Sequence, residues 1–402
     1  MRLPVHRWFK YSAGFSAEWV QQTIQERCVA SETTVLDPFA GSGTTLLVAD
    51  SCGVSSIGIE AHPFVATIAA TKLLWFTPVD NLRDKIQSIH HVANNLQHEP
   101  LQYPSLIYNC FGDESLHKLD KLRRAWLAEN DDSAVSQLAW LALTSILRPS
   151  SSAGTAQWQY ILPNKTKKVV ADPFDAFTLQ GELMRFDMRE FQREVKVSKA
   201  KLIRGDAREC PEVEDHSVGL VVTSPPYANN YDYADAMRFE MSFWGAVASW
   251  GGLHEAARRY LIRSSSQHAS IEKLQLEELL ANSHLDPIRP AITSVCHALA
   301  EERQHHGGKK HYHTMIAAYF VDLARVWHEL HRVCTPNATA CFVIGDSAPY
   351  GVYVPVDEWL GELALAAGFR SYRFEKLRDR NIKWKNRKHR VPLHEGRLWV
   401  ET

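Results

Sequence analysis

The sequence predicts an α/β fold built on a mostly parallel sheet, and two observations indicate it. Residues 33–62, "TTVLDPFAGSGTTLLVADSCGVSSIGIEAH", contain a short apolar strand, a glycine-rich turn, a helical segment and a second strand. A strand, a helix and a second strand in succession form a βαβ unit, in which the two strands are parallel. From Lys201 onward, strand-like apolar segments again alternate with segments of helical spacing. Both halves of the chain are therefore expected to contribute strands to one sheet.

The first elements surround the glycine turn. An amphipathic helix is expected from Ser16, whose hydroxyl is a suitable N-cap. Val35 and Leu36 form the first short strand, and Thr44–Ser51 has helical composition. "SSIGIE" forms a second strand, which Glu60 closes.

The second half of the chain supplies the remaining elements. Strands are expected at "KLIRGDA", ending at Asp206, at "VGLVVTSPPY", ending at Ser224, and at "NATACFVIGDS". Residues 316–333 have the apolar spacing of a long helix, and a second helix, "VDEWLGELALAAGF", stops at Gly368. The segments "SYRFEKLRDR" and "EGRLWVE" are expected to close the sheet as an antiparallel pair.

Two stretches depart from this alternation. Residues 73–200 contain helices and polar loops, including the low-complexity "LRPSSSAGTA", and residues from 245 to 310 are mostly helical. We interpret both as insertions into one α/β domain. The sequence contains no internal repeat.

The composition limits the classes of protein to consider. The chain has 402 residues, of which 45% are hydrophobic and 23% charged, as in ordinary soluble proteins. It has no apolar run of membrane-spanning length and no signal peptide at its N-terminus. The seven cysteines include no CxxC pair, which fits reduced thiols in the cytoplasm. Because the net charge is −1, a nucleic-acid surface would have to be local.

The turn after Asp37 carries the first chemical signal. Gly41 and Gly43 place backbone amides and a helix N-terminus against a ligand, and no GK[ST] follows as it would in a P-loop. Glu60 is placed to hold a ribose diol, and Asp206 to accept a hydrogen bond from an adenine amino group. Acids at three strand ends predict an adenosine-containing cofactor without a diphosphate. A tight turn with no ligand is the alternative.

The second signal is "SPPY", which follows a run of β-branched residues. Two prolines end a strand rigidly, because proline cannot donate to a β-ladder. Pro225 lacks an N–H, and its carbonyl is free to face a substrate; Ser224 supplies a second polar contact, and Tyr227 a flat aromatic face. Taken alone, the motif could be a turn that caps a strand above a core tyrosine.

Together, "DPFAGSGTT", "IGIE" and "SPPY" resemble the amino-methyltransferases that act on DNA bases, the S-adenosylmethionine enzymes of the N4-cytosine and N6-adenine groups. The resemblance covers residues 7–72, 201–245 and 315–402. It implies a class I, Rossmann-like methyltransferase fold with a mostly parallel seven-stranded sheet, two largely helical insertions and a terminal antiparallel hairpin.

The resemblance also implies which residues bind the cofactor. The FxGxG segment wraps the methionine part of S-adenosylmethionine, and the acid after the second strand holds the ribose. The residues expected to bind the cofactor are Asp37, Phe39, Ala40, Gly41, Ser42, Gly43, Glu60 and Asp206.

The catalytic motif implied by the resemblance is Ser224, Pro225, Pro226 and Tyr227. An exocyclic amine is a poor nucleophile because its lone pair is delocalised into the ring, so preorganised acceptors must hold its hydrogens. Tyr227 is expected to stack on a base that has flipped out of the duplex. Since SPPY is most often found in N4-cytosine enzymes, N4 of cytosine in DNA is the expected target, with N6 of adenine as the alternative.

Other functions fit the motifs less well. Guanine-N2 RNA methyltransferases usually carry (N/D)PPY and an RNA-binding domain before the catalytic one, whereas here the cofactor motif begins at Phe39. Protein-glutamine methyltransferases would show NPPY, and C5-cytosine chemistry would need a Pro-Cys dipeptide, which is absent. A catalytically silent nucleic-acid-binding subunit is the alternative from another class; the intact glycines, Glu60 and SPPY argue against it.

DNA contacts are expected after the catalytic motif and in basic segments. "NNYDYAD" either lines the base pocket or forms a polar loop. Residues 370–390 hold ten Lys/Arg and two acids with interleaved aromatics, so they contact phosphates or form a solvated hairpin. The expected DNA-binding residues are Asn229, Tyr231, Lys309, Lys310, Arg380, Lys383, Lys385, Arg387 and Lys388. We interpret "HHGGKKHYH", residues 305–313, as a basic loop beside the DNA, without a metal.

The predicted organisation has five parts. They are 1–72, the cofactor-binding first part of the core; 73–200, a helical insertion; 201–245, the catalytic part; 246–314, a second helical insertion and candidate target-recognition region; and 315–402, the C-terminal part with the basic hairpin. The expected partners are double-stranded DNA and a cognate restriction nuclease, and no membrane.

Overall fold

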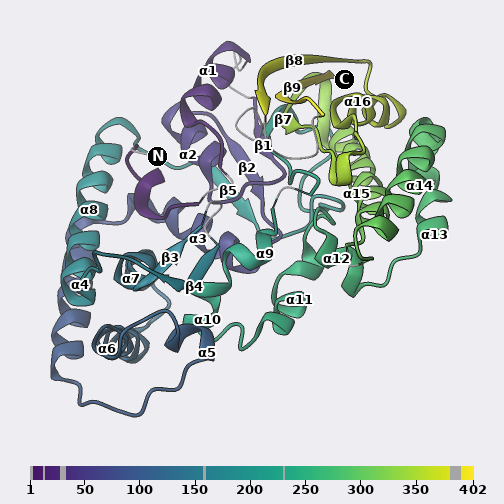
Figure 1. Cartoon of the computed structure of the whole chain (residues 1–402). Helices are drawn as coiled ribbons and strands as arrows, with labels where there is room; N and C mark the ends of the chain where they lie inside the picture. The colour runs from purple at the N-terminus through teal and green to yellow at the C-terminus, as the bar shows by residue number, and fades with distance from the viewer. Residues whose placement is uncertain are drawn as a thin grey trace.

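The computed structural model describes residues 3–11, 14–27, 33–156, 160–229, 231–308, 310–380 and 391–402. At its centre lies a seven-stranded sheet in the order β5-β2-β1-β6-β7-β9-β8 (Figure 1). Its strands are β1 (Val35–Asp37), β2 (Ser56–Ile59), β5 (Ala200–Ile203), β6 (Val218–Thr223), β7 (Cys334–Gly345), β8 (Ser371–Arg380) and β9 (Leu393–Glu401). The first five in this order are parallel, whereas β9 is antiparallel to both of its neighbours. The predicted fold class is confirmed.

Most predicted elements form close to their expected positions. Ser16 accepts a hydrogen bond from the Trp19 amide at 3.3 Å, as expected of a residue that caps α1 (Ala17–Arg27). One predicted boundary is wrong: β5 ends at Ile203, so Asp206 lies in the loop beyond the strand. Gly368 follows the second predicted helix with a φ of 113°, a conformation that glycine adopts without a steric penalty.

Both faces of the sheet are covered by helices, as parallel strands require. On one face, Val35 and Val222 pack against α1 and α2 (Thr44–Ser51). On the other face, Leu36 and Val221 belong to a core that includes α15 (Tyr312–Val333) and α16 (Val356–Ala366). Adjacent residues of β1 and β6 therefore face opposite helical layers.

The first insertion is a group of packed helices with a small hairpin. Its helices are α4 (Val79–Asn95), α5 (Ser105–Tyr108), α6 (Asp113–Glu129), α7 (Ala134–Ser150) and α8 (Pro173–Glu194). Between α7 and α8, β3 (Ala153–Thr155) pairs antiparallel with β4 (Ile161–Thr166). The stretch is largely helical, and the small hairpin is an element that the sequence did not predict.

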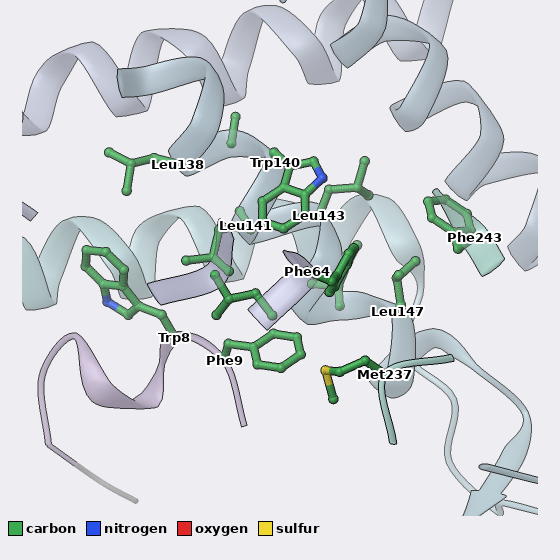
Figure 2. Close-up of a cluster of buried hydrophobic side chains, with 14 of the residues drawn as sticks. Trp8, Phe9, Phe64, Leu138, Trp140, Leu141, Leu143, Leu147, Met237 and Phe243 are labelled. Carbon is green, nitrogen blue, oxygen red and sulfur yellow. The ribbon is translucent and has the colours of Figure 1, made fainter. Parts of the chain in front are cut away.

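The first insertion shares its core with the N-terminal segment and with the residues after the catalytic motif (Figure 2). Trp8 is 1% exposed, and its indole nitrogen donates to Asp187 of α8 at 3.1 Å. Phe64 of α3 (Pro63–Lys72) packs edge-on against Trp140 of α7. The other residues labelled in this cluster are Phe9, Leu138, Leu141, Leu143, Leu147, Met237 and Phe243.

The helices α9 (Tyr233–Ala236) and α10 (Arg238–Phe243) follow the SPPY motif and precede the second insertion. The insertion itself contains α11 (Leu253–Ala256), α12 (Ser266–Ile271), α13 (Leu276–Leu280) and α14 (Arg289–His305), of which the last three pack along α15. In Figure 1 the helices α4 and α6–α8 lie on one side of the sheet, and α12–α14 lie on the other. Within the described ranges, every helix is too short or too polar to cross a membrane.

Candidate active site

The two sequence motifs meet in one pocket at the carboxyl ends of the parallel strands. The pocket contains about 750 Å³ of space outside the protein atoms, a figure that includes open solvent at its mouth. Eight of the predicted residues line it: Phe39, Ala40, Gly41, Ser42, Glu60, Asp206, Ser224 and Pro226. Parallel sheets bind ligands at this edge.

Asp37 lies beneath the pocket and organises the turn. It is fully buried, and its carboxylate accepts hydrogen bonds from the hydroxyls of Thr45 and Thr223, both at 2.6 Å, and from the Phe39 amide at 3.1 Å. Burial raises the pKa of Asp37 to about 6, although these hydrogen bonds oppose the shift. Asp37 therefore connects β1, α2 and β6 and does not line the pocket.

The glycines of the turn adopt backbone conformations that other residues rarely take. Gly41 has a φ of 54°, and a Cβ atom on it would lie 3.2 Å from the Tyr11 ring. Gly43 has a φ of 86° and precedes α2 as its N-cap. Glycine is therefore required at both positions by conformation, and at Gly41 also by the close approach of the ring.

Glu60 is held at the floor of the pocket by two backbone amides. Its oxygens accept hydrogen bonds from the Gly41 amide at 2.8 Å and the His62 amide at 2.7 Å. Burial raises the pKa of Glu60 to about 7, and the charge of Asp37 adds to this, whereas the two amides oppose it. Each carboxylate oxygen keeps a further lone pair that a ligand hydroxyl can use.

Two other polar atoms on the pocket wall have no partner among the described residues. The Ser42 hydroxyl oxygen is buried and unpaired, and so is Nε2 of His62. Burial lowers the pKa of His62 to about 4. Its Nδ1 accepts from the amides of Phe64 and Val65, so the neutral ring carries its proton on Nε2. Buried polar groups without partners are uncommon, so these two atoms point to a polar ligand.

The catalytic motif begins where β6 ends. The Ser224 hydroxyl donates to the Val343 carbonyl of β7 at 3.1 Å. The Pro226 carbonyl accepts a hydrogen bond from the Tyr319 hydroxyl at 3.0 Å. In contrast, no described residue donates to the carbonyl of Pro225, which is buried and does not line the pocket.

Comparisons with known proteins show which proteins the chain resembles. A family model described as a DNA methylase matches residues 5–71. The type II methyltransferase M.BsoBI of Geobacillus stearothermophilus is 26% identical over 94% of this chain and 81% of its own length. M.AvaI of Nostoc is 26% identical over 91% of this chain and 79% of its own length. M.MjaII of Methanocaldococcus jannaschii is 28% identical over 29% of this chain and 20% of its own length.

The chain is thus similar to the DNA methylase family over residues 5–71 and to type II methyltransferases over more than nine tenths of its length. These findings support a DNA methyltransferase whose cofactor is S-adenosylmethionine. The pocket has groups that fit this cofactor: Glu60 can accept from the ribose hydroxyls, and the unpaired atoms of Ser42 and His62 can meet its polar groups.

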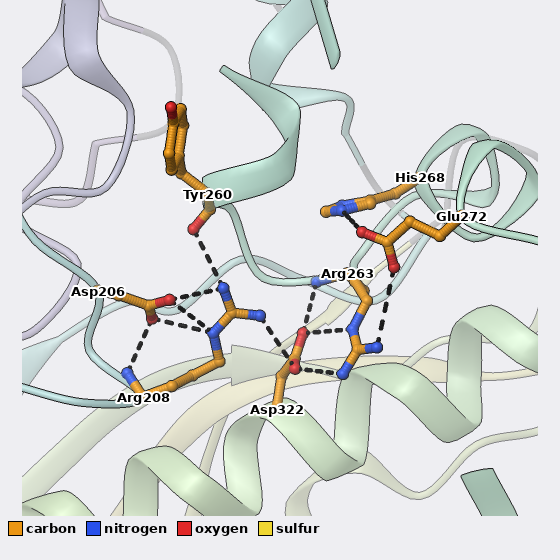
Figure 3. Close-up of polar contacts among 7 residues, drawn as sticks. All are labelled: Asp206, Arg208, Tyr260, Arg263, His268, Glu272 and Asp322. Carbon is orange, nitrogen blue, oxygen red and sulfur yellow. Dashed lines mark hydrogen bonds and ion pairs between the residues drawn. The ribbon is translucent and has the colours of Figure 1, made fainter. Parts of the chain in front are cut away.

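Asp206 lines the pocket of the methyltransferase with its carboxylate already held by a neighbour. Arg208 donates to it from Nε at 2.9 Å, from Nη2 at 2.6 Å and from its backbone amide at 2.9 Å (Figure 3). The side chain of Asp206 is still 38% exposed. It is therefore accessible to a ligand but fixed in direction.

The residues after the catalytic motif form part of the core more than of the surface. Tyr227 is half-buried, and the Arg380 guanidinium lies 5.3 Å from the centre of its ring. Tyr231 is 4% exposed and packs edge-on against Tyr233. Asn229 has a φ of 57°, and its amide donates to the Ser264 carbonyl of the second insertion.

The expected DNA-binding cations are only partly within the described residues. Lys309, Lys383, Lys385, Arg387 and Lys388 lie outside them. Lys310 is exposed. Arg380 is only 16% exposed and donates to the Asp346 carbonyl at 2.8 Å, so the structure places it against the catalytic motif. Within the expected basic loop, residues 305–313, the His306 ring stacks on Tyr350.

Several pocket residues of the methyltransferase were not predicted. Tyr11, Gly14 and Phe15 come from the N-terminal segment. The adjacent Gly14 and Phe15, just before α1, are the sequence feature that could have indicated a pocket wall here. Tyr260, Leu261 and Ile262 come from the second insertion. No sequence pattern marks this last group, because only the tertiary packing of the insertion brings it to the sheet edge.

Proposed function

We propose that the methyltransferase modifies N4 of cytosine at a specific site in double-stranded DNA. The observation that carries the proposal is that Ser224 and Pro226 line the same pocket as Glu60 and the glycine turn. A methyl donor bound in this pocket lies beside the catalytic motif. The choice of cytosine follows from serine in the first position of SPPY, through the family resemblance, and N6 of adenine is the alternative.

The motif offers two acceptors to the target amine. Because the Ser224 hydroxyl donates its proton to Val343, its oxygen is oriented to accept from the substrate. The second acceptor that the motif predicts is the Pro225 carbonyl, to which no described residue donates; because Pro225 is buried and outside the pocket lining, the turn has to open for the amine to reach it. Hydrogen bonds to both amine hydrogens direct the nitrogen lone pair at the methyl group. When bound, S-adenosylmethionine would supply the electrophilic methyl group; the amine nitrogen would form the new C–N bond and lose its proton to water, and S-adenosylhomocysteine would be the leaving group.

Tyr227 provides the surface for a flipped base. One face of its ring lies under the Arg380 guanidinium, so a stacked base would take the opposite face. Stacking of a base on an aromatic ring contributes about 1–3 kcal/mol, and a cation above the opposite face fixes the ring in position.

DNA reading is assigned to the second insertion, 246–314, and phosphate contacts to Lys310, Lys383, Lys385, Arg387 and Lys388. Lys310→Ala is expected to weaken DNA binding for all sequences alike. It should also reduce the slope of the logarithm of affinity against the logarithm of salt concentration by about one. A cognate restriction nuclease is the expected biological partner. Deleting the insertion is not a clean test, because Tyr260–Ile262 also form a wall of the cofactor pocket.

The test is nucleoside mass spectrometry after incubation with genomic DNA and labelled S-adenosylmethionine. We expect N4-methylcytosine from the wild type and little product from Ser224→Ala, with Ser217→Ala as a control because Ser217 is a half-buried serine that precedes β6 and lies outside the pocket. N6-methyladenine as the product would contradict the cytosine assignment but not the site. Product in transfer RNA and none in DNA would contradict the proposal as a whole.

A further inference from the structure

Arg208 lies between two carboxylates and contacts a third group in the second insertion (Figure 3). Besides its bonds to Asp206, its Nη1 lies 3.1 Å from Asp322. Its Nη2 also donates to the carbonyl of Tyr260 at 3.4 Å. The Arg208 side chain is 12% exposed and Asp322 is fully buried, so these contacts form away from bulk water.

Asp322, on α15, joins Arg208 to the second insertion. Its carboxylate accepts hydrogen bonds from Arg263 Nε at 3.0 Å, from Arg263 Nη2 at 2.6 Å and from the Arg263 backbone amide at 3.0 Å. Burial alone would raise the pKa of Asp322, but Arg263 and Arg208 hold it below its usual value. Arg263 in turn lies 3.9 Å from Glu272, which pairs with His268.

The group of Asp206, Arg208, Asp322 and Arg263 connects two walls of one pocket. Asp206 lines the pocket on one side, and Tyr260, just before Arg263 in the chain, lines it as well. A carboxylate has about four acceptor positions and a guanidinium is a planar fork of five donors. One guanidinium can therefore fix the direction of the Asp206 carboxylate and at the same time hold the Tyr260 backbone, provided that Asp322 anchors it.

We propose that Arg208, anchored by Asp322, is a positioning residue for adenine selection: it aims Asp206 at the amino group of the cofactor and ties segment 260–263 to the pocket. The inference rests on the proposed role of Asp206 in cofactor binding. It gives the second insertion a part in cofactor recognition, in addition to any contact with DNA.

The test compares two ligands that differ at one position of the base. S-adenosylhomocysteine carries the amino group, and S-inosylhomocysteine carries a carbonyl oxygen in its place. The wild type is expected to prefer the first by about 10–100-fold, the range for a hydrogen bond to a charged acceptor. In Arg208→Lys the preference should fall below about threefold, because an ammonium group cannot bridge two carboxylates as a planar fork does. Calorimetric titration measures both dissociation constants.

The control is Arg148→Lys. Arg148 is 13% exposed and pairs with the fully buried Glu240, so it matches Arg208 in burial and partner but lies outside the pocket. It should keep the wild-type preference, because a general loss of packing lowers both affinities alike. Should Arg208→Lys not fold, Asp322→Asn removes the anchor and is expected to lose the preference too.

The outcomes separate the inference from the proposed function. If the wild type prefers the adenine ligand and Arg208→Lys keeps that preference, the positioning role is wrong, and Asp206 remains the adenine contact. A wild type with no preference overturns the assignment of Asp206 itself and, with it, the inference.

Discussion

Removal of the Glu60 carboxylate should weaken cofactor binding strongly and abolish its dependence on pH. Glu60 is 9% exposed, lines the pocket and is held by the Gly41 and His62 amides. Hydrogen bonds to a charged carboxylate contribute about 1.5–3 kcal/mol. Loss of the ribose contact in Glu60→Ala therefore raises the dissociation constant by about 10–150-fold, since each 1.4 kcal/mol is a factor of ten.

The pH dependence follows from the burial of this carboxyl group. Burial raises the pKa of Glu60 to about 7, so much of the cofactor-free protein carries a neutral carboxyl at pH 6. Only the carboxylate can accept from both ribose hydroxyls, so binding requires the proton to leave. The dissociation constant of the wild type should then fall by about tenfold between pH 6 and pH 8.

Calorimetric titration with S-adenosylhomocysteine at several pH values measures both effects. The pH dependence of the dissociation constant of Glu60→Ala, measured in parallel, reports the titration of the ligand itself. The difference in pH dependence between the wild type and this variant is then due to Glu60. Asp50→Ala is the matched control: Asp50 is 2% exposed and accepts hydrogen bonds from Trp75 and Ser198, but it lies outside the pocket. If Glu60→Ala binds within twofold of the wild type at pH 8, the ribose assignment is wrong.

Three further outcomes are expected. Tyr227→Ala should weaken binding of target DNA by about 1–3 kcal/mol in fluorescence anisotropy and leave S-adenosylhomocysteine binding unchanged; equal DNA affinities would exclude stacking on this ring. Trp8→Ala should lower the free energy of unfolding by about 3–5 kcal/mol in urea denaturation, because Trp8 is 1% exposed within the core shared with the first insertion; a loss below about 1 kcal/mol would show that the two parts unfold separately. The third outcome concerns the stability of the cofactor-free protein. Burial raises the pKa of Glu60 from 4.5 to about 7, so between these pH values the carboxyl is protonated in the native protein and ionised in the unfolded chain. The free energy of unfolding of the cofactor-free wild type should therefore decrease, relative to that of Glu60→Ala, as pH rises across this window, and parallel curves for the two proteins would contradict the burial of the charge.

The parts of the fold that the sequence predicts are those with local signals. Gly41 and Gly43 mark the turn because their positive φ values exclude most other residues. The apolar run before Ser224 marks β6, since a strand that is buried on both faces must be apolar throughout. Each signal lies within a few residues of the structure that it specifies.

The parts that were not predicted depend on contacts between distant segments. Trp8 and Asp187 are 179 residues apart, and nothing near either residue indicates the pair. Arg380 was expected on DNA because of the basic run around it, yet its guanidinium lies over Tyr227. Composition reports that cations are concentrated in a segment, but only tertiary packing decides which of them points inward.

The same distant contacts give both insertions a place in the catalytic apparatus. The Asp232 amide donates to the Tyr160 hydroxyl of the first insertion at 2.7 Å, and the Asp232 carboxylate pairs with Arg258 of the second at 2.9 Å. The loop after SPPY is therefore fixed from both sides, while Tyr260 closes the cofactor pocket. A core reduced to the two motifs would lack a pocket wall and the supports of its catalytic loop. This agrees with the similarity to M.BsoBI, which extends over 94% of the chain and so through both insertions. Both insertions therefore support the loop after SPPY, and the second also forms a wall of the pocket.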